Sequence, residues 1–370
     1  MATNKNDKTL NVPHLRFPEF TDEWGKYKLS DVCSFFSGGT PSSSKKEYYD
    51  GSIPFIRSGE LHMNKTELFI TEEGLNNSAA KMVEIGDLLL ALYGATSGDI
   101  AISQIKGAIN QAILCIRTTQ NKKFIESVWK KHVEKLLQTY LQGGQGNLSA
   151  DIVKNISFYF TNSSEQMKLA KFISLLDERI ATQNKIIEKL QSLIKGLAAQ
   201  LTQSGTPNIR LCDCLECHSS TLQENCVSVT GSYPVYGATG LIGYTNNYAY
   251  NGESILIVKD GSGVGSLSYV NDHFSVIGTL NYLTAKENYS ILYLYYALMA
   301  FNFTPYITGM AIPHIYFKDY GKAKLFYPSI EKRIRIASLL HNIEQKLVVE
   351  QNLVISLSTQ KSYLLRMLFI

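Results

Sequence analysis

Long apolar runs are missing from this sequence, although 45% of its 370 residues are hydrophobic. A membrane-spanning helix needs about 20 consecutive apolar residues, so none is expected here. The first ten residues, MATNKNDKTL, are polar and lack the apolar stretch of a secretory signal. We therefore expect a cytoplasmic protein with enough apolar residues for a core in each of two or more domains.

Residues arranged for catalysis are missing as well. The six cysteines are too unevenly placed for a disulfide framework. Most of them gather between residues 212 and 226, beside His218, which leaves open a zinc site and with it a metal-dependent nuclease. The glycine-rich segment GSGVGS, residues 261–266, lacks the spacing of a phosphate-binding loop. We predict no catalytic residue and no metal ligand in this chain.

A long helix with a narrow apolar stripe is predicted near the middle of the chain. Between residues 169 and 201, apolar residues recur at steps of four and three, the spacing of a coiled-coil seam. A stripe this narrow requires a partner helix, whereas a core helix of a globular domain is the alternative interpretation. The predicted pairing residues are Leu169, Ile173, Leu176, Ile180, Gln183, Ile187 and Leu190.

A second seam follows 167 positions later and indicates an internal repeat. The same offset joins Gly94 to Gly261 and Leu148 to Ile315, while near the start of each half the offset is 182. The two-fold repeat consists of a body of mixed α and β structure followed by a long helix. The pairing residues of the second helix are Ile336, Leu340, Ile343, Leu347, Glu350, Val354 and Leu357.

The repeat weakens the zinc hypothesis. Cys214 occupies the position that Val32 occupies in the first half, so we expect Cys214 to fill the core as a small apolar residue. In the seams, Glu350 of the second helix falls at the position of Gln183. With the helices antiparallel, these two polar residues would lie near the midpoint, where a polar pair can fix the register.

Four segments resemble the specificity subunit of type I restriction–modification enzymes. Its opening is similar to VPHLRFPEFTDEW followed by KYKLSDVCSFFSGGTPS. Its recognition-domain pattern resembles YPVYGATGLIGYTNNYAYNGESILIVKDGSGVGSL, and its helix start resembles SEQMKLAKFISLLDERI. The second helix start, EKRIRIASLLHNIEQKL, lacks the double Gln usual in the family, and its seam also carries Lys361.

This resemblance implies an α+β fold with two mixed α/β target-recognition domains, separated by two long antiparallel coiled-coil helices in a pseudo-two-fold internal repeat. The implied division is an N-terminal polar tail (1–20), target-recognition domain 1 (21–160), a central spacer helix (161–204), target-recognition domain 2 (205–328) and a C-terminal spacer helix (329–370).

The resemblance also implies the function. Each recognition domain would read one half of a bipartite site in double-stranded DNA, and the helices would space the domains and dock two methyltransferase subunits. Restriction and translocase subunits are further expected partners. The chain itself would be a non-catalytic part of DNA methylation or cleavage, with S-adenosylmethionine, ATP and Mg on the partner subunits.

Candidate DNA-binding residues are those that suit phosphate contacts on glycine-rich loops or contacts with base edges. For each, a turn residue without DNA contact is the alternative. In the first domain they are Ser37, Gly38, Gly39, Thr40, Arg57, Ser58, Tyr93, Thr96, Ser97, Gln145 and Asn147. In the second they are Tyr236, Thr239, Lys259, Asp260, Ser262 and His314. Arg57 follows an apolar strand, so we expect its guanidinium to leave the fold toward a guanine or a phosphate.

A free-standing DNA-binding regulator is the main rival interpretation. Such a protein would need no docking surface on the outer faces of its helices. Those faces carry Phe172, Leu175, Ile186 and Leu193, more apolar residues than a solvated face requires. We therefore favour a subunit that docks others, and place the metal-dependent nuclease last.

Overall fold

A computed structural model describes residues 10–141 and 147–370, so that Gln145 lies outside the described residues. The chain forms two compact units. The first runs to Thr182 and also includes Val354–Ile370, while the second comprises Gln183–Leu353. Each unit therefore contains one mixed α/β body together with part of both long helices.

The body of the first unit contains two four-stranded sheets. Leu88, Leu89 and Leu90 of strand β6 (Leu88–Ala91) are all buried, which explains why this strand is a continuous apolar run. One sheet has the order β2 (Cys33–Ser37), β9 (Ile113–Thr118), β6 (Leu88–Ala91), β7 (Ile100–Ile102), and the other β4 (Phe69–Ile70), β3 (Tyr49–Ile56), β8 (Gly107–Ile109), β5 (Lys81–Val83). A separate pair is formed by β1 (Gly25–Lys28) and β10 (Ser157–Phe160).

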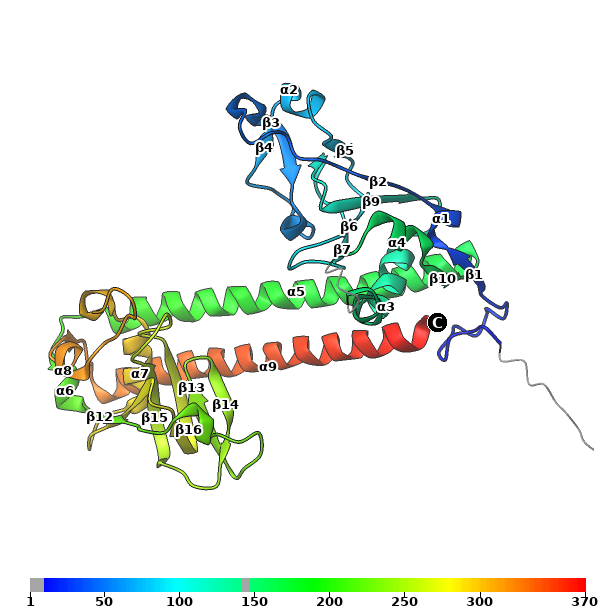
Figure 1. The fold of residues 1–370 in the computed structure, drawn as a ribbon. Helices are drawn as coiled ribbons and strands as arrows, with labels where there is room; N and C mark the ends of the chain where they lie inside the picture. Colours follow the sequence, from blue (N-terminus) through cyan, green and yellow to red (C-terminus); the bar gives the residue numbers. More distant parts are fainter. Residues whose placement is uncertain (1–9, 142–146) are drawn as a thin grey trace, which may run out of the picture. The chain divides into compact units, whose positions relative to one another are not determined.

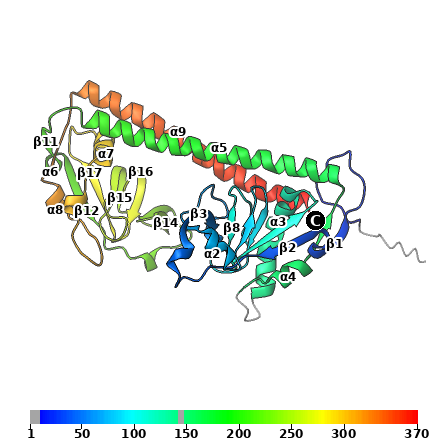
Figure 2. The ribbon, with the colours of Figure 1, turned by 90° about the horizontal axis from the view of Figure 1, so that it is seen from above.

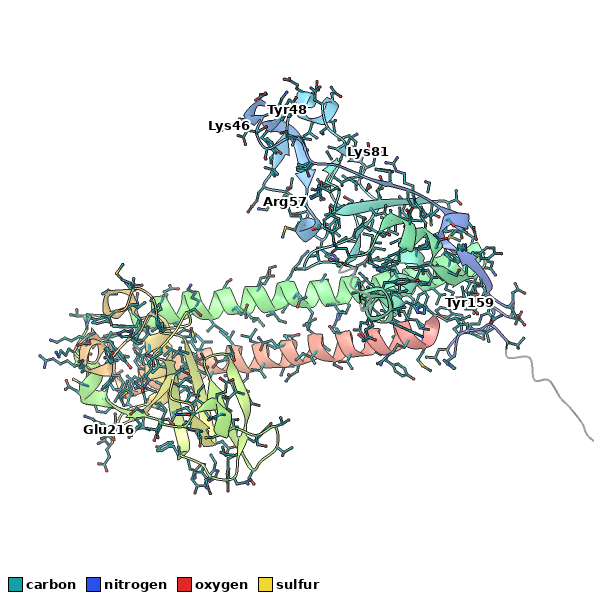
Figure 3. The ribbon with its side chains drawn as sticks, in the orientation of Figure 1. Lys46, Tyr48, Arg57, Lys81, Tyr159 and Glu216 are labelled. Atoms are coloured by element: carbon teal, nitrogen blue, oxygen red, sulfur yellow. The ribbon has the colours of Figure 1, made fainter. Side chains whose placement is uncertain are left out.

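Short helices and one long one complete this body. The long one is α3 (Lys122–Leu141), which packs Phe124, Val128 and Trp129 into the core. Figure 3 shows Lys46 and Tyr48 at the start of β3 and Arg57 at its far end. The other helices are α1 (Leu29–Val32), η1 (Lys46–Tyr48), η2 (Ser58–Glu60), α2 (Glu72–Asn76) and α4 (Ala150–Asn155).

The body of the second unit is built on one six-stranded sheet. Its order is β12 (Leu215–Ser219), β17 (Leu280–Ala285), β15 (Tyr250–Val258), β16 (Leu267–Val276), β13 (Tyr233–Gly237), β14 (Gly240–Thr245). A separate pair is formed by β11 (Ile209–Arg210) and β18 (Lys324–Leu325). The helices are α6 (Leu211–Cys214), η3 (Glu224–Cys226), α7 (Ile291–Met299), η4 (Thr304–Tyr306) and α8 (Phe317–Tyr320). Cys214 is buried in this core, as expected, and so are most residues of α7.

The internal repeat is confirmed down to the register of the strands. Cys33 pairs with Thr118 between β2 and β9, and the corresponding Leu215 pairs with Ala285 between β12 and β17. The parallel pairing of β3 with β8 returns as that of β13 with β16. One difference is that β16 is a single ten-residue strand, whereas its counterpart is divided into β7 and β8. The two bodies are therefore the same fold with different loops.

The two long helices are α5 (Ser163–Thr202) and α9 (Ile330–Leu368). In the first unit, Leu169 and Ile173 of α5 share a core with Leu368 near the end of α9. In the second unit, Ala198 near the end of α5 shares a core with Ile336 near the start of α9. The helices therefore run antiparallel within each unit, where they lie side by side (Figures 1 and 2).

The predicted seams face inward, and the two charged positions of the second seam have ion-pair partners. All fourteen predicted pairing residues are buried or half-buried. Lys361, one of the two charged residues in the second seam, forms an ion pair with Asp177 of α5, which also pairs with Lys123 of α3 at 2.6 Å. Burial acts to raise the pKa of Asp177, but the hydrogen bonds from the two lysines prevail and hold it below its ordinary value. The ion pair of Glu350 is with Lys346, one turn earlier on its own helix.

Residues 10–20 of the predicted polar tail pack against the first unit. Arg16 donates two hydrogen bonds to the buried carboxylate of Glu165, at 2.7 and 2.8 Å. Phe17 covers Phe172 of α5 edge-on, with ring centroids 6.1 Å apart. Phe172 is thus partly shielded and is less available for docking than Leu175, which is exposed. Within the described parts of the chain, none of the helices has the length and apolar character needed to cross a membrane.

Candidate nucleic-acid interface

Two matched glycine turns follow the central strands of the two bodies. Gly94 and Gly98 come after β6 with φ of +84° and +86°, and Gly261 and Gly265 come after β15 with φ of +99° and +86°. Glycine adopts this left-handed backbone without the steric cost that a side chain brings. The repeat has therefore kept an unusual turn at the same place in both units.

Each turn is fixed by hydrogen bonds that recur in the other unit. One bond joins the turn to the strand that precedes it. Another joins the end of that strand to the segment just before the last short helix of the body, which is α4 in the first unit and α8 in the second. These bonds are Gly98 N to Ala91 O and Leu148 N to Leu92 O in the first unit, and Gly265 N to Val258 O and Ile315 N to Lys259 O in the second, each 2.9 Å long.

The first turn gathers several of the predicted residues. Tyr93, Thr96 and Ser97 belong to the turn itself, and exposed Asn147 precedes the fastened Leu148. The Ser97 hydroxyl donates to the carbonyl oxygen of Leu92 at 3.0 Å, which commits its proton to the fold. Burial raises the pKa of Tyr93, so its hydroxyl stays protonated and can donate to a ligand. These four residues therefore form one surface beside the turn.

The segment after β2 reaches the neighbouring loop before β9. The Thr40 hydroxyl donates to Gln111 Oε1 at 2.6 Å. A Cβ atom at Gly38 would lie 1.8 Å from the carbonyl oxygen of Ile109, and Gly39 is buried. The two glycines thus permit close packing of the backbone, while half-buried Ser37 ends β2.

Arg57 follows β3 as expected, but its guanidinium folds back onto the protein. Nη2 donates to Glu60 Oε1 at 2.8 Å and Nε to Glu60 Oε2 at 3.3 Å. The hydrogen bond to Glu60 raises the pKa of Arg57, while 48% of the arginine side chain remains exposed. The free edge of the guanidinium can still reach a ligand, beside half-buried Ser58.

His62 and Asp99 complete this surface, and sequence reasoning missed both. His62 Nε2 lies 2.9 Å from each carboxylate oxygen of Asp99, which directly follows the glycine turn. Burial acts to raise the pKa of Asp99, but the hydrogen bond with His62 outweighs it and leaves the pKa low. The position of Asp99 next to Gly98 was a usable signal, whereas His62 is distant in the sequence and carried none.

The second turn gathers its own set. Lys259 N donates to the carbonyl oxygen of Thr279 at 3.0 Å, and Asp260 forms an isolated β-bridge with His314. Thr279 lies in the loop between β16 and β17. This loop also contacts β13, because Ile277 N donates to the carbonyl oxygen of Tyr236. Thr239 is exposed in the turn after β13, and Ser262 is exposed in the glycine turn.

Both surfaces offer the groups that DNA contacts require. Exposed hydroxyls and backbone N–H groups suit phosphate oxygens, and the Arg57, Lys259 and His314 side chains suit base edges. Across residues 10–141 and 147–370, no three or more His, Cys, Asp or Glu side chains are placed to hold a metal ion. The arrangement is thus suited to recognition of an anionic, hydrogen-bonding polymer.

Comparison with known proteins gives a consistent result. A family model described as "Type I restriction modification DNA specificity domain" matches residues 21–192 and again 209–357. The chain is 25% identical over 210 residues to the type I restriction enzyme MjaVIII specificity subunit of Methanocaldococcus jannaschii, covering 55% of this chain and 47% of that protein. It is 23% identical over 363 residues to the EcoprrI specificity subunit of Escherichia coli, covering 87% of each.

Solved structures show the same fold. A type I restriction–modification S subunit from M. genitalium superimposes with a TM-score of 0.67 at 18% identity, over 97% of this chain and 99% of that one. Of the curated relatives, the match spans about half of MjaVIII and 42% of the MjaIX specificity subunit, also from Methanocaldococcus jannaschii.

Proposed function

Because this chain belongs to the family of type I restriction modification DNA specificity domains, we propose that it is the DNA-reading subunit of a type I restriction–modification complex. Each unit reads one half of a bipartite site in double-stranded DNA. The subunit is non-catalytic. S-adenosylmethionine, ATP and Mg²⁺ bind to partner subunits. Those subunits methylate the DNA and, where a restriction subunit is present, cleave it.

The duplicated turn is the observation that carries this proposal. The family match covers both halves, and both units hold the same glycine turn with equivalent hydrogen bonds. The side chains around the turns differ, however, with Thr96 and Ser97 in one unit and Ser262 in the other. A conserved scaffold with different loop residues is what two readers of two different half-sites require.

The residues around each turn divide the work by chemistry. Hydroxyls and turn N–H groups hold phosphates, which positions the unit on the duplex without reading its sequence. Arg57 and Lys259 can donate to the O6 and N7 acceptors of guanine in the major groove. Asp260 can accept from the N4 amino group of cytosine.

The outer faces of the long helices suit a protein partner. On α5, Leu175 is exposed in the first unit and Ile186 and Leu193 in the second. On α9, Val348 and Val349 are exposed in the second unit. Where exposed apolar side chains gather into a patch on a helix, they suit a contact surface. We assign these faces to the methyltransferase subunits, and the spacing of the two reading units to the helices themselves.

Methylome sequencing tests the proposal directly. Cells with the gene should show a split methylated motif, which should disappear when the gene is deleted. Replacing residues 205–328 with those of another family member should change one half of the motif and leave the other unchanged. Methyl transfer by the isolated chain, or changes in both halves of the motif, would contradict the proposal.

A further inference from the structure

An apolar loop tip stands out on the surface of the second unit. It lies between η4 and α8, in the orange part of Figure 1. The Met310 side chain is fully exposed and Ile312 is 65% exposed, although both are large apolar residues. Burial of such side chains is favourable, so their joint exposure on one loop points to a ligand.

The loop is held in a defined shape. Thr308 and His314 exchange two backbone hydrogen bonds, of 2.9 and 2.8 Å, which close the hairpin. His314 Nδ1 donates to the carbonyl oxygen of Ile312 at 3.1 Å. Gly309 has φ of +90°, and a Cβ atom there would lie 2.3 Å from that same carbonyl oxygen. The tip is therefore presented by a built hairpin.

The hairpin is fastened to the proposed DNA surface. Gly261 N, in the glycine turn, donates to the carbonyl oxygen of Pro313 at 2.9 Å. His314 bridges Asp260, and Ile315 N donates to the carbonyl oxygen of Lys259. The apolar tip is thus continuous with the polar groups assigned to base and phosphate contacts, so DNA is the ligand that the proposed function brings to it.

DNA offers an apolar ligand of the right size in the thymine 5-methyl group, which lies in the major groove. The other apolar contact, a wedge between two bases, must force them apart and therefore needs a supported side chain. Met310 is fully exposed, so no packing holds it against such a load. Its flexible thioether suits a small methyl group instead.

We propose that Met310 and Ile312 read the methyl group of a thymine in the second half-site, an inference that rests on the proposed function. In sequence they correspond to Gly143 and Gln145 of the first half, which lie outside the described residues. Neither of those is an apolar side chain of comparable size. These two positions of the first half therefore lack the apolar pair that the second half has.

The test compares thymine with deoxyuridine, which lacks the methyl group. The chain, bound to its methyltransferase partner, is titrated with duplexes of the methylated motif in which each thymine is replaced in turn. One replacement in the second half-site should weaken binding about 4-fold, the effect of one buried methyl group. Replacements in the first half-site should have no such effect.

Protein variants complete the cycle. Met310→Ala should bind the thymine duplex more weakly than the native chain does, and should discriminate less between the thymine and deoxyuridine duplexes. Because Met310 is fully exposed, this variant should fold normally. Met63→Ala, at an exposed methionine of the first unit, is the matched control and should retain the discrimination.

Three outcomes would overturn the inference. All the deoxyuridine duplexes could bind equally, or the second half-site could contain no A·T pair. The third is a rise in the fluorescence of 2-aminopurine placed in the second half-site, which would reveal a wedge between bases. In each of these the complex still binds its motif. Failure of the proposed function differs, because then no sequence-specific binding would be seen with any duplex.

Discussion

At the scale of single residues, Arg57 has a structural role beside the reading role predicted for it. Its guanidinium and its backbone N–H both donate to Glu60, whose carboxylate also accepts from the Thr66 hydroxyl at 3.0 Å. Burial acts to raise the pKa of Glu60, but these hydrogen bonds keep it below its ordinary value. Without Arg57 this buried carboxylate would lose its main partner.

Arg57→Ala should therefore destabilise the first unit as well as affect DNA binding. We expect the free energy of unfolding, measured in urea, to fall by about 1–3 kcal/mol because Glu60 loses its partner. If Arg57 reads a guanine, discrimination at one position of the first half-site should also fall by about 1–3 kcal/mol. Equal weakening on all sequences would instead make Arg57 a phosphate contact.

Glu60→Gln is the companion variant. It preserves the shape of the side chain but removes the charge that holds the guanidinium in place. A folded Glu60→Gln protein with unchanged reading of the half-site would show that the ion pair does not position Arg57 for DNA. Altered discrimination at the position affected by Arg57→Ala would show that it does.

His132 predicts a dependence of stability on pH. Its ring stacks on Phe158, and Nε2 lies 2.8 Å from a main-chain oxygen of Ile370. Burial, with the nearby charges of Lys131 and Lys135, lowers its pKa to about 4. The unfolded chain, with an ordinary pKa of about 6.5, therefore binds the proton more readily than the folded one.

The contribution of His132 to the free energy of unfolding is complete above about pH 6.5, and it is lost as the pH falls from there through about 4. Over this window the free energy of unfolding should fall by about 1–3 kcal/mol more in the native protein than in His132→Gln. Urea titrations at a series of pH values provide the measurement. His14→Gln, at an exposed histidine, should keep the native profile; a native profile in His132→Gln would refute the assignment.

At the scale of elements, two glycines are predicted to respond oppositely to alanine. Gly196 lies within α5, and a Cβ atom there would meet nothing within 4 Å. Gly98 has φ of +86°, and a Cβ atom there would lie 2.8 Å from Val133 Cγ2 of α3. Alanine thus suits the first position and is strained at the second.

Gly196→Ala should raise the free energy of unfolding by about 0.5–1 kcal/mol, because alanine loses less backbone freedom in a helix. Gly98→Ala should lower it by about 1–3 kcal/mol and weaken reading of the first half-site only. Urea unfolding and binding to the motif measure the two effects. A stabilising Gly98→Ala would show that the turn does not need its left-handed backbone.

At the scale of the whole molecule, the proposed spacing role of α5 and α9 predicts the effect of a paired insertion. Seven residues preserve the heptad seam, and they add about 10 Å of helix. They belong after Thr182 in α5 and after Leu353 in α9, where the two compact units divide, so that each unit stays whole. About 10 Å corresponds to roughly three base pairs of duplex.

The unspecified gap of the motif should then lengthen by about 2–4 base pairs, with unchanged half-sites. Binding should weaken by a few kcal/mol, because the half-sites move to a different face of the duplex and the DNA must twist or bend. Methylome sequencing of cells carrying the variant reads the gap directly. A folded, active variant with the original gap would show that the helices do not set the spacing.

Two kinds of information in the sequence determined most of the fold. Periodicity predicted α5 and α9, because a helix that buries one face repeats its apolar residues every three to four positions. The duplication pairs Gly94 with Gly261, and both have a left-handed backbone, because both copies must meet the same backbone constraint. Neither signal requires knowledge of which distant residues touch.

Only the tertiary structure decided the partners of the polar side chains. Lys361 interrupts a seam in the sequence, yet in the fold it pairs with Asp177. His62 is hydrogen-bonded to Asp99. The Arg57 side chain was expected to point away from the fold, but it is bound to Glu60. The ion pair of Lys361 and the hydrogen bond of His62 join residues that are far apart in the chain, and a polar side chain repeats at no period. Which charge meets which is therefore set by packing, and the sequence alone carries no local trace of it.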